Sequence, residues 1–149
     1  MRAVVQRSGP AEVVIGGRVV GRIDSGVVVL VGISPEDGEA EARWLADKVC
    51  NLRIFPDDAD RMNRSLVDAG GGALIVSQFT LYGDARKGRR PSFVRAAQGP
   101  AGRAVYERAV EAFKDRGVPT ATGEYGAMME VALTNRGPVT ILLDSDKTF

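Results

Sequence analysis

The residues best placed to do chemistry form one short segment, Ser77, Gln78, Phe79 and Thr80, at the end of an apolar run. A hydroxyl attacks an ester only when a base removes its proton, and histidine is the commonest such base. The chain contains no histidine. Ser65 and Ser77 also lack the glycine-flanked turn of a hydrolase nucleophile, which excludes a serine-hydrolase triad. Any hydrolysis must therefore proceed without an imidazole.

A cluster of cations lies a few residues further on, at Arg86, Lys87, Arg89 and Arg90. The formal net charge of the whole chain is only +1, so the cluster is a local patch and not part of a generally basic protein. Such a run is typical of a solvated surface or of a site for nucleic-acid phosphates. Because it follows the segment 77–80 so closely, a ligand there would have cations within reach of its phosphates.

The dipeptide Gly137-Pro138 separates two apolar runs near the end of the sequence. A plain turn between two strands accounts for it. The bond before a proline also adopts the cis form at a much lower cost than other peptide bonds do. In that form two neighbouring carbonyl groups would point the same way. The residues alone leave both possibilities open.

Two other groups of reactive side chains favour structural roles. Cys50 lies among apolar neighbours without a residue that would make it a thiolate, so we expect a small buried hydrophobic side chain. Asp57, Asp58 and Asp60 lack the glycine and the distal glutamate of a calcium loop, which favours a solvated turn. We therefore assign no residue to a metal and expect no cofactor.

The elements that would position these residues begin with strands. Residues 13–15 and 18–23 are β-branched runs on either side of Gly16-Gly17, a pattern that predicts a hairpin. Residues 27–33 form a continuous apolar run, which is typical of a strand buried on both faces. Residues 73–79 repeat that pattern, so the segment 77–80 should lie at the end of a strand.

Two helices are predicted. The segment Ser34-Pro35-Glu36-Asp37 offers a capping hydroxyl, a proline for the first helical position and acids for the first turn, so a helix should start there. Its apolar stripe would comprise Ala42, Leu45, Ala46, Val49 and Leu52. A second helix is expected over residues 101–116, with Gly117 and Pro119 behind it as a stop signal.

The order of the elements indicates the fold class. Residues 127–134 and 139–143 predict two further strands after the second helix. Strands and helices do not alternate as they do in a doubly wound fold. We therefore expect an α+β fold, with a mostly antiparallel or mixed, barrel-like sheet and two main helices packed against it. The length of 149 residues suits a single domain, residues 1–149.

Composition favours a cytoplasmic protein. The one cysteine cannot form an intrachain disulfide, and residues 1–7 are too polar and too short for the apolar stretch of a signal peptide. No apolar run approaches the roughly 20 residues that span a bilayer, so we expect no membrane insertion.

Residues 77–81 and 135–140 resemble the paired signature of the D-aminoacyl-tRNA deacylase (D-tyrosyl-tRNA deacylase) family. The resemblance runs nearly end to end, because further stretches match that family in order and spacing: residues 1–7, 51–55, 62–66 and 86–93. It implies hydrolysis of the ester of D-aminoacyl-tRNA, and of glycyl-tRNA, to free tRNA and amino acid, as chirality proofreading.

The resemblance also implies a homodimer with its active sites at the interface. The Gly137-Pro138 pair of one subunit, in the cis form, would enter the pocket of the other, and Arg7 would help to hold this inserted loop. Residues 77–80 would line the pocket, where main-chain N–H groups would stabilise the oxyanion of the scissile ester. The basic cluster would contact the tRNA.

The implied selectivity depends on main chain. An enzyme that spares every L-aminoacyl-tRNA cannot use side-chain contacts, because the accepted and rejected amino acids share side chains. Carbonyl groups of Gly137 and Pro138 would hold the α-amino group and leave no room for an L side chain. The family mechanism enlists the 2′-hydroxyl of the terminal adenosine. Since no base lies in the motif, Thr80 is expected to shape the pocket and not to act as a nucleophile.

Two departures from the family pattern concern the inserted loop and the tRNA contacts. Arg136 stands where a small or acidic residue is expected, and Ser8-Gly9-Pro10 replaces a polar and basic stretch after Arg7.

Two other functions remain. A sister deacylase with relaxed chirality and a trans Gly-Pro bond is disfavoured by Phe79, where methionine is expected. A non-catalytic RNA-binding module would use the basic cluster alone.

Overall fold

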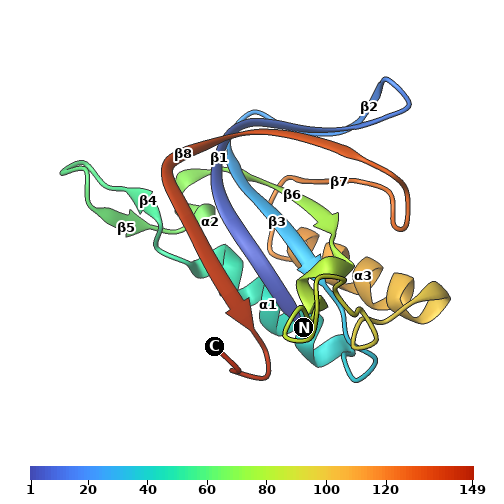
Figure 1. Cartoon of the computed structure of the whole chain (residues 1–149). Coiled ribbons are helices and arrows are strands. Elements are labelled where there is room, and N and C mark those ends of the chain that lie inside the picture. Colours follow the sequence, from blue (N-terminus) through green and yellow to red (C-terminus); the bar gives the residue numbers. More distant parts are fainter.

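One long strand organises the sheet. The computed structural model describes residues 1–149, and its β1 (Arg2–Ile15) pairs along the first half with β3 (Gly26–Gly32) on one side and β8 (Glu130–Asp144) on the other. The second half of β1 pairs with β2 (Arg18–Ile23) and again with β8. All these pairings are antiparallel. The beginning and end of the chain therefore lie side by side in the sheet (Figure 1).

The other side of the sheet is parallel and curls back on itself. β6 (Gly72–Ser77) pairs with β3, and β7 (Thr120–Thr122) pairs with β6. β7 then comes so close to β2 that a side-chain carbon at Gly21 would overlap the carbonyl oxygen of Thr122. The sheet is thus a nearly closed, mixed barrel (Figure 1), which confirms the predicted barrel-like α+β fold.

Helices cover one face of this barrel. α1 (Glu39–Asn51) and α3 (Gly99–Lys114) pack against each other and against Val27, Val29 and Val31 of β3. The alternate residue Val28 packs inside the barrel. The prediction that residues 27–33 are buried on both faces is confirmed, and so are the two main helices. No helix is long and apolar enough to cross a bilayer.

The predicted start of the first helix is wrong. Residues 34–37 form a turn, and α1 begins only at Glu39, after Gly38. The reason is tertiary: one oxygen of the Asp37 carboxylate accepts the Ser34 N–H at 2.7 Å, and the other accepts the Met1 ammonium group. The Glu41 carboxylate instead accepts the Gly38 N–H at 2.8 Å, and this backbone hydrogen bond lowers the pKa of Glu41.

The two strands predicted near the end of the chain are one. β8 runs from Glu130 to Asp144 and includes Gly137-Pro138, and residues 127–129 belong to the loop before it. A plain turn is therefore wrong. The chain bends within the strand, where the Asn135 side chain accepts the Val139 N–H at 3.1 Å. The pairing register of β1 with β8 is irregular at the same level, between Gln6 and Ala11.

Short elements complete the chain. A projecting arm consists of β4 (Phe55–Pro56) and β5 (Met62–Arg64), and α2 (Leu66–Ala69) follows it (Figure 1). In the turn of this arm Asp57 accepts hydrogen bonds from the N–H groups of Ala59 and Arg61, in agreement with the predicted solvated turn.

Cys50 has the expected structural role. The side chain is fully buried in α1 as part of the hydrophobic core. Burial raises the pKa of the thiol to about 11, so the group stays protonated and unreactive at neutral pH.

The approach of β2 to β7 generates a prediction. Gly21→Ala should cost about 1–3 kcal/mol of unfolding free energy, because the added carbon meets the Thr122 backbone, which cannot move without opening the barrel. Urea unfolding followed by circular dichroism measures the loss. Val19→Ala in the same strand is the control, since that side chain is 54% exposed and its truncation should change stability by less than about 0.5 kcal/mol. Equal effects would contradict this account of barrel closure.

Candidate functional site

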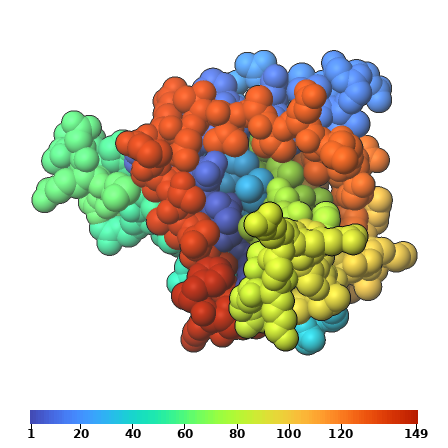
Figure 2. Space-filling model, viewed as in Figure 1, coloured from blue at the N-terminus to red at the C-terminus, as the bar shows by residue number.

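A cleft of about 570 Å³ opens at the carboxyl ends of β3 and β6. Its walls come from three parts of the chain: the strand ends with residues 76–79, the start of α3 at residues 97–99, and the loop of residues 125–129. The molecular face drawn in Figure 2 is hollowed between β8 (red) and the segment around residues 80–95 (yellow-green). Most of the lining is apolar, and polar groups gather at the strand ends.

Main-chain donors lie where β6 ends. The Gln78 N–H donates to the Val31 carbonyl at 2.7 Å, and the chain then enters a single 3₁₀ turn, η1 (Phe79–Tyr82). The first hydrogen bond of this turn runs from the Leu81 N–H to the Gln78 carbonyl at 3.2 Å. The N–H groups of Phe79 and Thr80 therefore have no acceptor within the turn. Two adjacent free donors of this kind suit a developing oxyanion.

No base is positioned to activate Thr80. Its hydroxyl accepts a short hydrogen bond from the Gln78 side-chain amide, which is not a base. The chain also has no group of three or more histidine, cysteine, aspartate or glutamate side chains that could hold a metal ion. The arrangement can orient a bound ester and stabilise negative charge, but it supplies no general base of its own.

Phe79 forms part of the rim of the cleft. Its ring is 53% exposed and meets the ring of Phe93 edge to face, with 5.1 Å between the centroids. An aromatic side chain that is half in solvent and fixed on one edge can contact a ligand that enters the cleft.

Sequence reasoning missed the loop that forms one wall. Residues 127–129 were predicted as strand, yet Met128 is 92% exposed and contributes to the cleft with Tyr125. The loop is held by α3, because Arg103 donates to the Tyr125 carbonyl at 3.2 Å and the rings of Tyr106 and Tyr125 lie 5.7 Å apart. The glycines at positions 123 and 126 were the available signal for a loop.

The Gly137-Pro138 pair lies within β8, near the level at which β3 begins. The bond between these residues is cis, the form that the resemblance implied, and both residues are exposed. Arg7 lies beside the pair. Its Nε donates to the Arg136 carbonyl at 3.0 Å and its Nη1 donates to the Ile54 carbonyl at 2.6 Å. A side-chain carbon at Gly137 would lie 2.7 Å from Arg7 Nη2, at a backbone φ of +125°.

One subunit does not bring the two signature segments together. Ser77 is level with Val31 and Ala3 in the sheet, whereas Arg7, which contacts Gly137, is level with Val27. The separation of four positions between these levels corresponds to roughly 13 Å along the strands. The two segments therefore lie too far apart in one subunit to form a single pocket.

The two departures from the family pattern are in contact with each other. The guanidinium of Arg136 lies over Gly9, so closely that a side-chain carbon at Gly9 would be 2.7 Å from Arg136 Nε. Gly9 itself is buried. The glycine therefore leaves the space that the arginine fills, and each residue depends on the other.

The basic cluster lies on a closed loop after η1. Backbone hydrogen bonds between Asp84 and Ser92, at 2.8 and 2.9 Å, tie its ends together. Arg86 is partly neutralised, because its side chain and its N–H both bind the Asp84 carboxylate and hold the pKa of that group far below its usual range. Lys87, Arg89 and Arg90 are exposed, and each is free of ion pairs.

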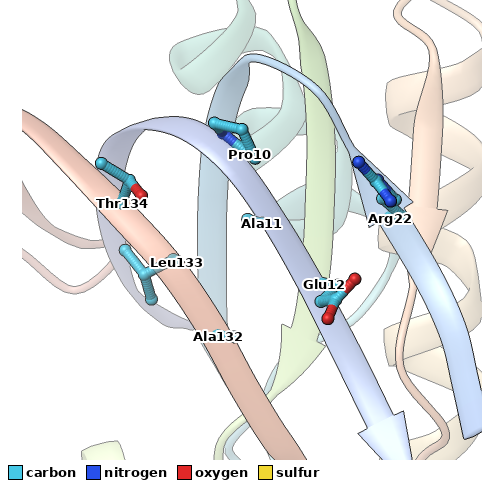
Figure 3. Close-up of a pocket in the computed structure, with 7 residues that line it drawn as sticks. All are labelled: Pro10, Ala11, Glu12, Arg22, Ala132, Leu133 and Thr134. Atoms are coloured by element: carbon cyan, nitrogen blue, oxygen red, sulfur yellow. The ribbon is translucent and has the colours of Figure 1, made fainter.

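A second hollow of about 310 Å³ lies between β1, β2 and β8 (Figure 3). Glu12 and Arg22 stand opposite each other on β1 and β2 and are its only charged side chains. Thr134 supplies its one side-chain hydroxyl, and neither signature segment lines it. The cleft at residues 76–79 is therefore the better candidate active site.

Comparison with known proteins identifies the family of the chain. Residues 4–144 match the family model described as D-Tyr-tRNA(Tyr) deacylase. A D-aminoacyl-tRNA deacylase of Thermus aquaticus is 55% identical over 147 residues, which cover 99% of this chain and 97% of that protein. One of Syntrophobacter fumaroxidans is 53% identical over the whole of both chains. The chain belongs to the D-Tyr-tRNA(Tyr) deacylase family.

Two solved structures share the fold. One, described as a c-Myc DNA Unwinding Element Binding Protein, is 38% identical, with a TM-score of 0.91 over 97% of this chain and 99% of that one. The other, described as a probable eukaryotic D-amino acid tRNA deacylase, has a TM-score of 0.80 over 95% and 97% of the two chains. At 21% identity the second likeness concerns the fold alone.

The contact of Gly9 with Arg136 generates a prediction. Gly9→Ala should displace the flexible Arg136 side chain from its place, whereas in an Arg136→Ala background the three atoms nearest to the added methyl group are gone. The two effects on unfolding free energy should thus differ by at least about 0.5 kcal/mol. Thermal unfolding of the four members of this double-mutant cycle measures the difference. Additive effects would show that the residues are independent.

Proposed function

We propose that this protein hydrolyses the ester bond of D-aminoacyl-tRNA and releases free tRNA and a D-amino acid. The observation that carries the proposal is the full-length match to relatives with that name, which includes both signature segments. The geometry supports it: the cleft offers free main-chain N–H groups at Phe79 and Thr80 for an oxyanion, beside walls that are mostly apolar.

Catalysis is assigned to the substrate, because the site contains no base. In this mechanism the 2′-hydroxyl of the terminal adenosine orients or activates the attacking water, which adds to the ester carbonyl. The negative charge on that oxygen is stabilised by the N–H groups of Phe79 and Thr80, and the tRNA 3′-oxygen leaves with a proton. Ser77 and Gln78 shape the pocket, and the Gln78 amide holds the Thr80 hydroxyl in place.

The complete site is assigned to a homodimer. Gly137 and Pro138 are exposed and lie too far along the strands to reach the cleft of their own subunit. We assign them to the cleft of a partner subunit, with Arg7 as the support of the loop. The second half of β8 is an unpaired sheet edge on the side away from β1, and Leu142 there is 59% exposed, which suits a symmetric contact.

Selectivity follows from that assembly. Main-chain carbonyls of Gly137 and Pro138 would bind the α-amino group and leave no space on the side where an L side chain points. Glycine has no side chain to exclude, so glycyl-tRNA is assigned as a second substrate.

The exposed cations Lys87, Arg89 and Arg90, with Arg86, are assigned to tRNA phosphates. Because the proposed substrate is a tRNA, we assign the enzyme to the cytoplasm, and the proposed mechanism uses no cofactor.

The test is deacylation of D-tyrosyl-tRNA, with L-tyrosyl-tRNA as control. Release of D-tyrosine with the L form intact supports the proposal, and cleavage of both forms would identify a sister enzyme with relaxed chirality, which Phe79 disfavours. The structure described as a DNA unwinding element binding protein makes nucleic-acid binding the other outcome. Binding without cleavage would favour it and overturn the proposal.

The mechanism predicts unequal effects of two changes. Thr80→Ala should lower the rate by less than about tenfold, because the threonine transfers no proton; a nucleophile or general acid would cost a hundredfold or more. A tRNA with a 2′-deoxy terminal adenosine should be cleaved far more slowly. Single-turnover assays measure both. An inactive Thr80→Ala enzyme together with normal cleavage of the 2′-deoxy substrate would make Thr80 the nucleophile.

The shared site predicts complementation between subunits. Ser77→Phe fills the cleft with a ring, and Gly137→Ala adds a methyl group against Arg7, so each variant alone should be inactive. A mixed dimer, isolated with two different affinity tags, should regain about half of the wild-type activity, since one of its two sites is intact. If each site lay within one subunit, the mixed dimer would have no intact site and no activity.

A further inference from the structure

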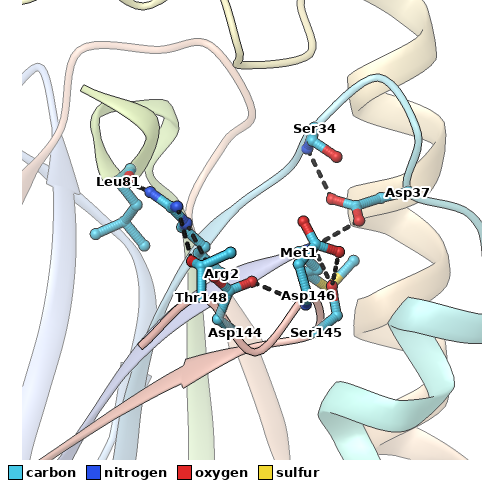
Figure 4. Close-up of polar contacts among 9 residues, drawn as sticks. All are labelled: Met1, Arg2, Ser34, Asp37, Leu81, Asp144, Ser145, Asp146 and Thr148. Carbon is cyan, nitrogen blue, oxygen red and sulfur yellow. Dashed lines mark hydrogen bonds and ion pairs between the residues drawn. The ribbon is translucent and has the colours of Figure 1, made fainter. Parts of the chain in front are cut away.

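Arg2 joins the active-site turn to the end of the chain. Its Nη1 donates to the Leu81 carbonyl of η1 at 3.1 Å, and its Nη2 donates to the Thr148 hydroxyl at 3.2 Å. Nε faces the Asp144 carboxylate at 3.4 Å. Figure 4 shows these groups converging on one guanidinium, which comes from the first residue of β1. Segments that are far apart in sequence are thus held by a single side chain.

The guanidinium is enclosed on its flat faces as well. It lies over the ring of Tyr82 at 4.8 Å and over that of Phe149 at 5.5 Å, and the arginine side chain is only 19% exposed. Its Nε is buried and makes an ion pair without a hydrogen bond. A charge in such a place is costly unless its partners are well fixed. We therefore expect the Arg2 charge to have a role besides its contribution to folding stability.

Asp144 keeps the partner charge in place. Its side chain is fully buried, and this burial alone would raise the pKa of the carboxyl group. Hydrogen bonds from Thr148 and from the Asp146 N–H, with the charge of Arg2, outweigh burial and leave the pKa below its usual value. The carboxylate is thus ionised at neutral pH and holds Arg2 from the side opposite Leu81.

The hydrogen bond from Arg2 to the Leu81 carbonyl fixes the second half of η1. η1 has only four residues, and its start is fixed by the hydrogen bond from the Gln78 N–H to Val31. The last carbonyl groups of a helical turn have no partner within it. Arg2 supplies one, so the turn is anchored at both ends. Between the anchors lie Phe79 and Thr80, whose N–H groups are assigned to the oxyanion.

We propose that Arg2 is a positioning residue for the deacylation site, which acts through the Leu81 carbonyl and is held there by Asp144 and Thr148. The inference rests on the proposed function. Arg2 does not line the cleft and so does not touch the substrate. Its loss should therefore misplace the oxyanion donors without removing substrate contacts, which lowers kcat and leaves KM nearly unchanged.

The test compares Arg2→Met with Arg2→Lys and with a control for stability, Val110→Ala in the buried face of α3. Arg2→Met should lower kcat roughly tenfold to hundredfold, which is less than the loss of an oxyanion donor outright, with KM within about twofold. Arg2→Lys keeps the charge beside Asp144 but lacks the fork that reaches two acceptors. It should recover most of the melting temperature but only part of kcat.

Hydrogen–deuterium exchange of residues 78–83, measured without substrate, reads the position of the turn directly. Exchange there should be faster in Arg2→Met than in Val110→Ala. The proposal is overturned if this exchange is unchanged, if kcat falls no further than in Val110→Ala, or if Arg2→Lys restores kcat fully. An inactive wild-type protein would refute the proposed function instead, and the exchange experiment would still decide whether Arg2 anchors the turn.

Discussion

The pairing of β1 with strands on both of its sides is the constraint on which the rest of the structure depends. β1 brings β3 and β8 together, and so fixes the level of Ser77 relative to Gly137. It also carries Arg2 and Arg7, which reach the two ends of that arrangement. One strand therefore sets the separation of the two signature segments and supplies an arginine to each. Since the strands are stiff, the separation cannot be closed within a subunit, which supports the proposed assignment of the loop at Gly137 to a partner subunit.

Much of the fold could be predicted because it depends on local patterns. The apolar runs of residues 27–33 and 73–79, and the hairpin at Gly16-Gly17, are local signals, and the structure has a strand or hairpin at each, although the second strand ends at Ser77 and Phe79 already belongs to η1. The errors arose where a distant residue decides local structure. Asp37 does not start a helix, because Ser34 and the Met1 ammonium group bind both of its oxygens. Met1 and Asp37 are 36 positions apart, so no short window of sequence contains both.

The candidate site divides in the same way. The chemistry was predictable by exclusion, because a chain without histidine restricts hydrolysis to mechanisms that need no imidazole. The signature segments were visible as motifs. The supporting residues were not: two glycines mark the loop that holds Tyr125 and Met128 but do not show that it lines the cleft, and Arg2 reaches Leu81 across 79 positions of sequence. Such residues have no motif, since their role is defined only by what the fold places beside them.

The pair of Gly9 and Arg136 shows why departures from a family pattern should be judged together. Taken singly, an arginine beside Gly137 adds bulk and charge to a loop that is assigned to a partner's pocket. In the fold, its guanidinium lies over Gly9, while the Arg136 carbonyl accepts a hydrogen bond from Arg7 Nε at 3.0 Å. A main-chain carbonyl can accept this hydrogen bond whichever side chain its own residue carries. The support of the loop therefore survives the exchange, and the space left by Gly9 removes the remaining conflict.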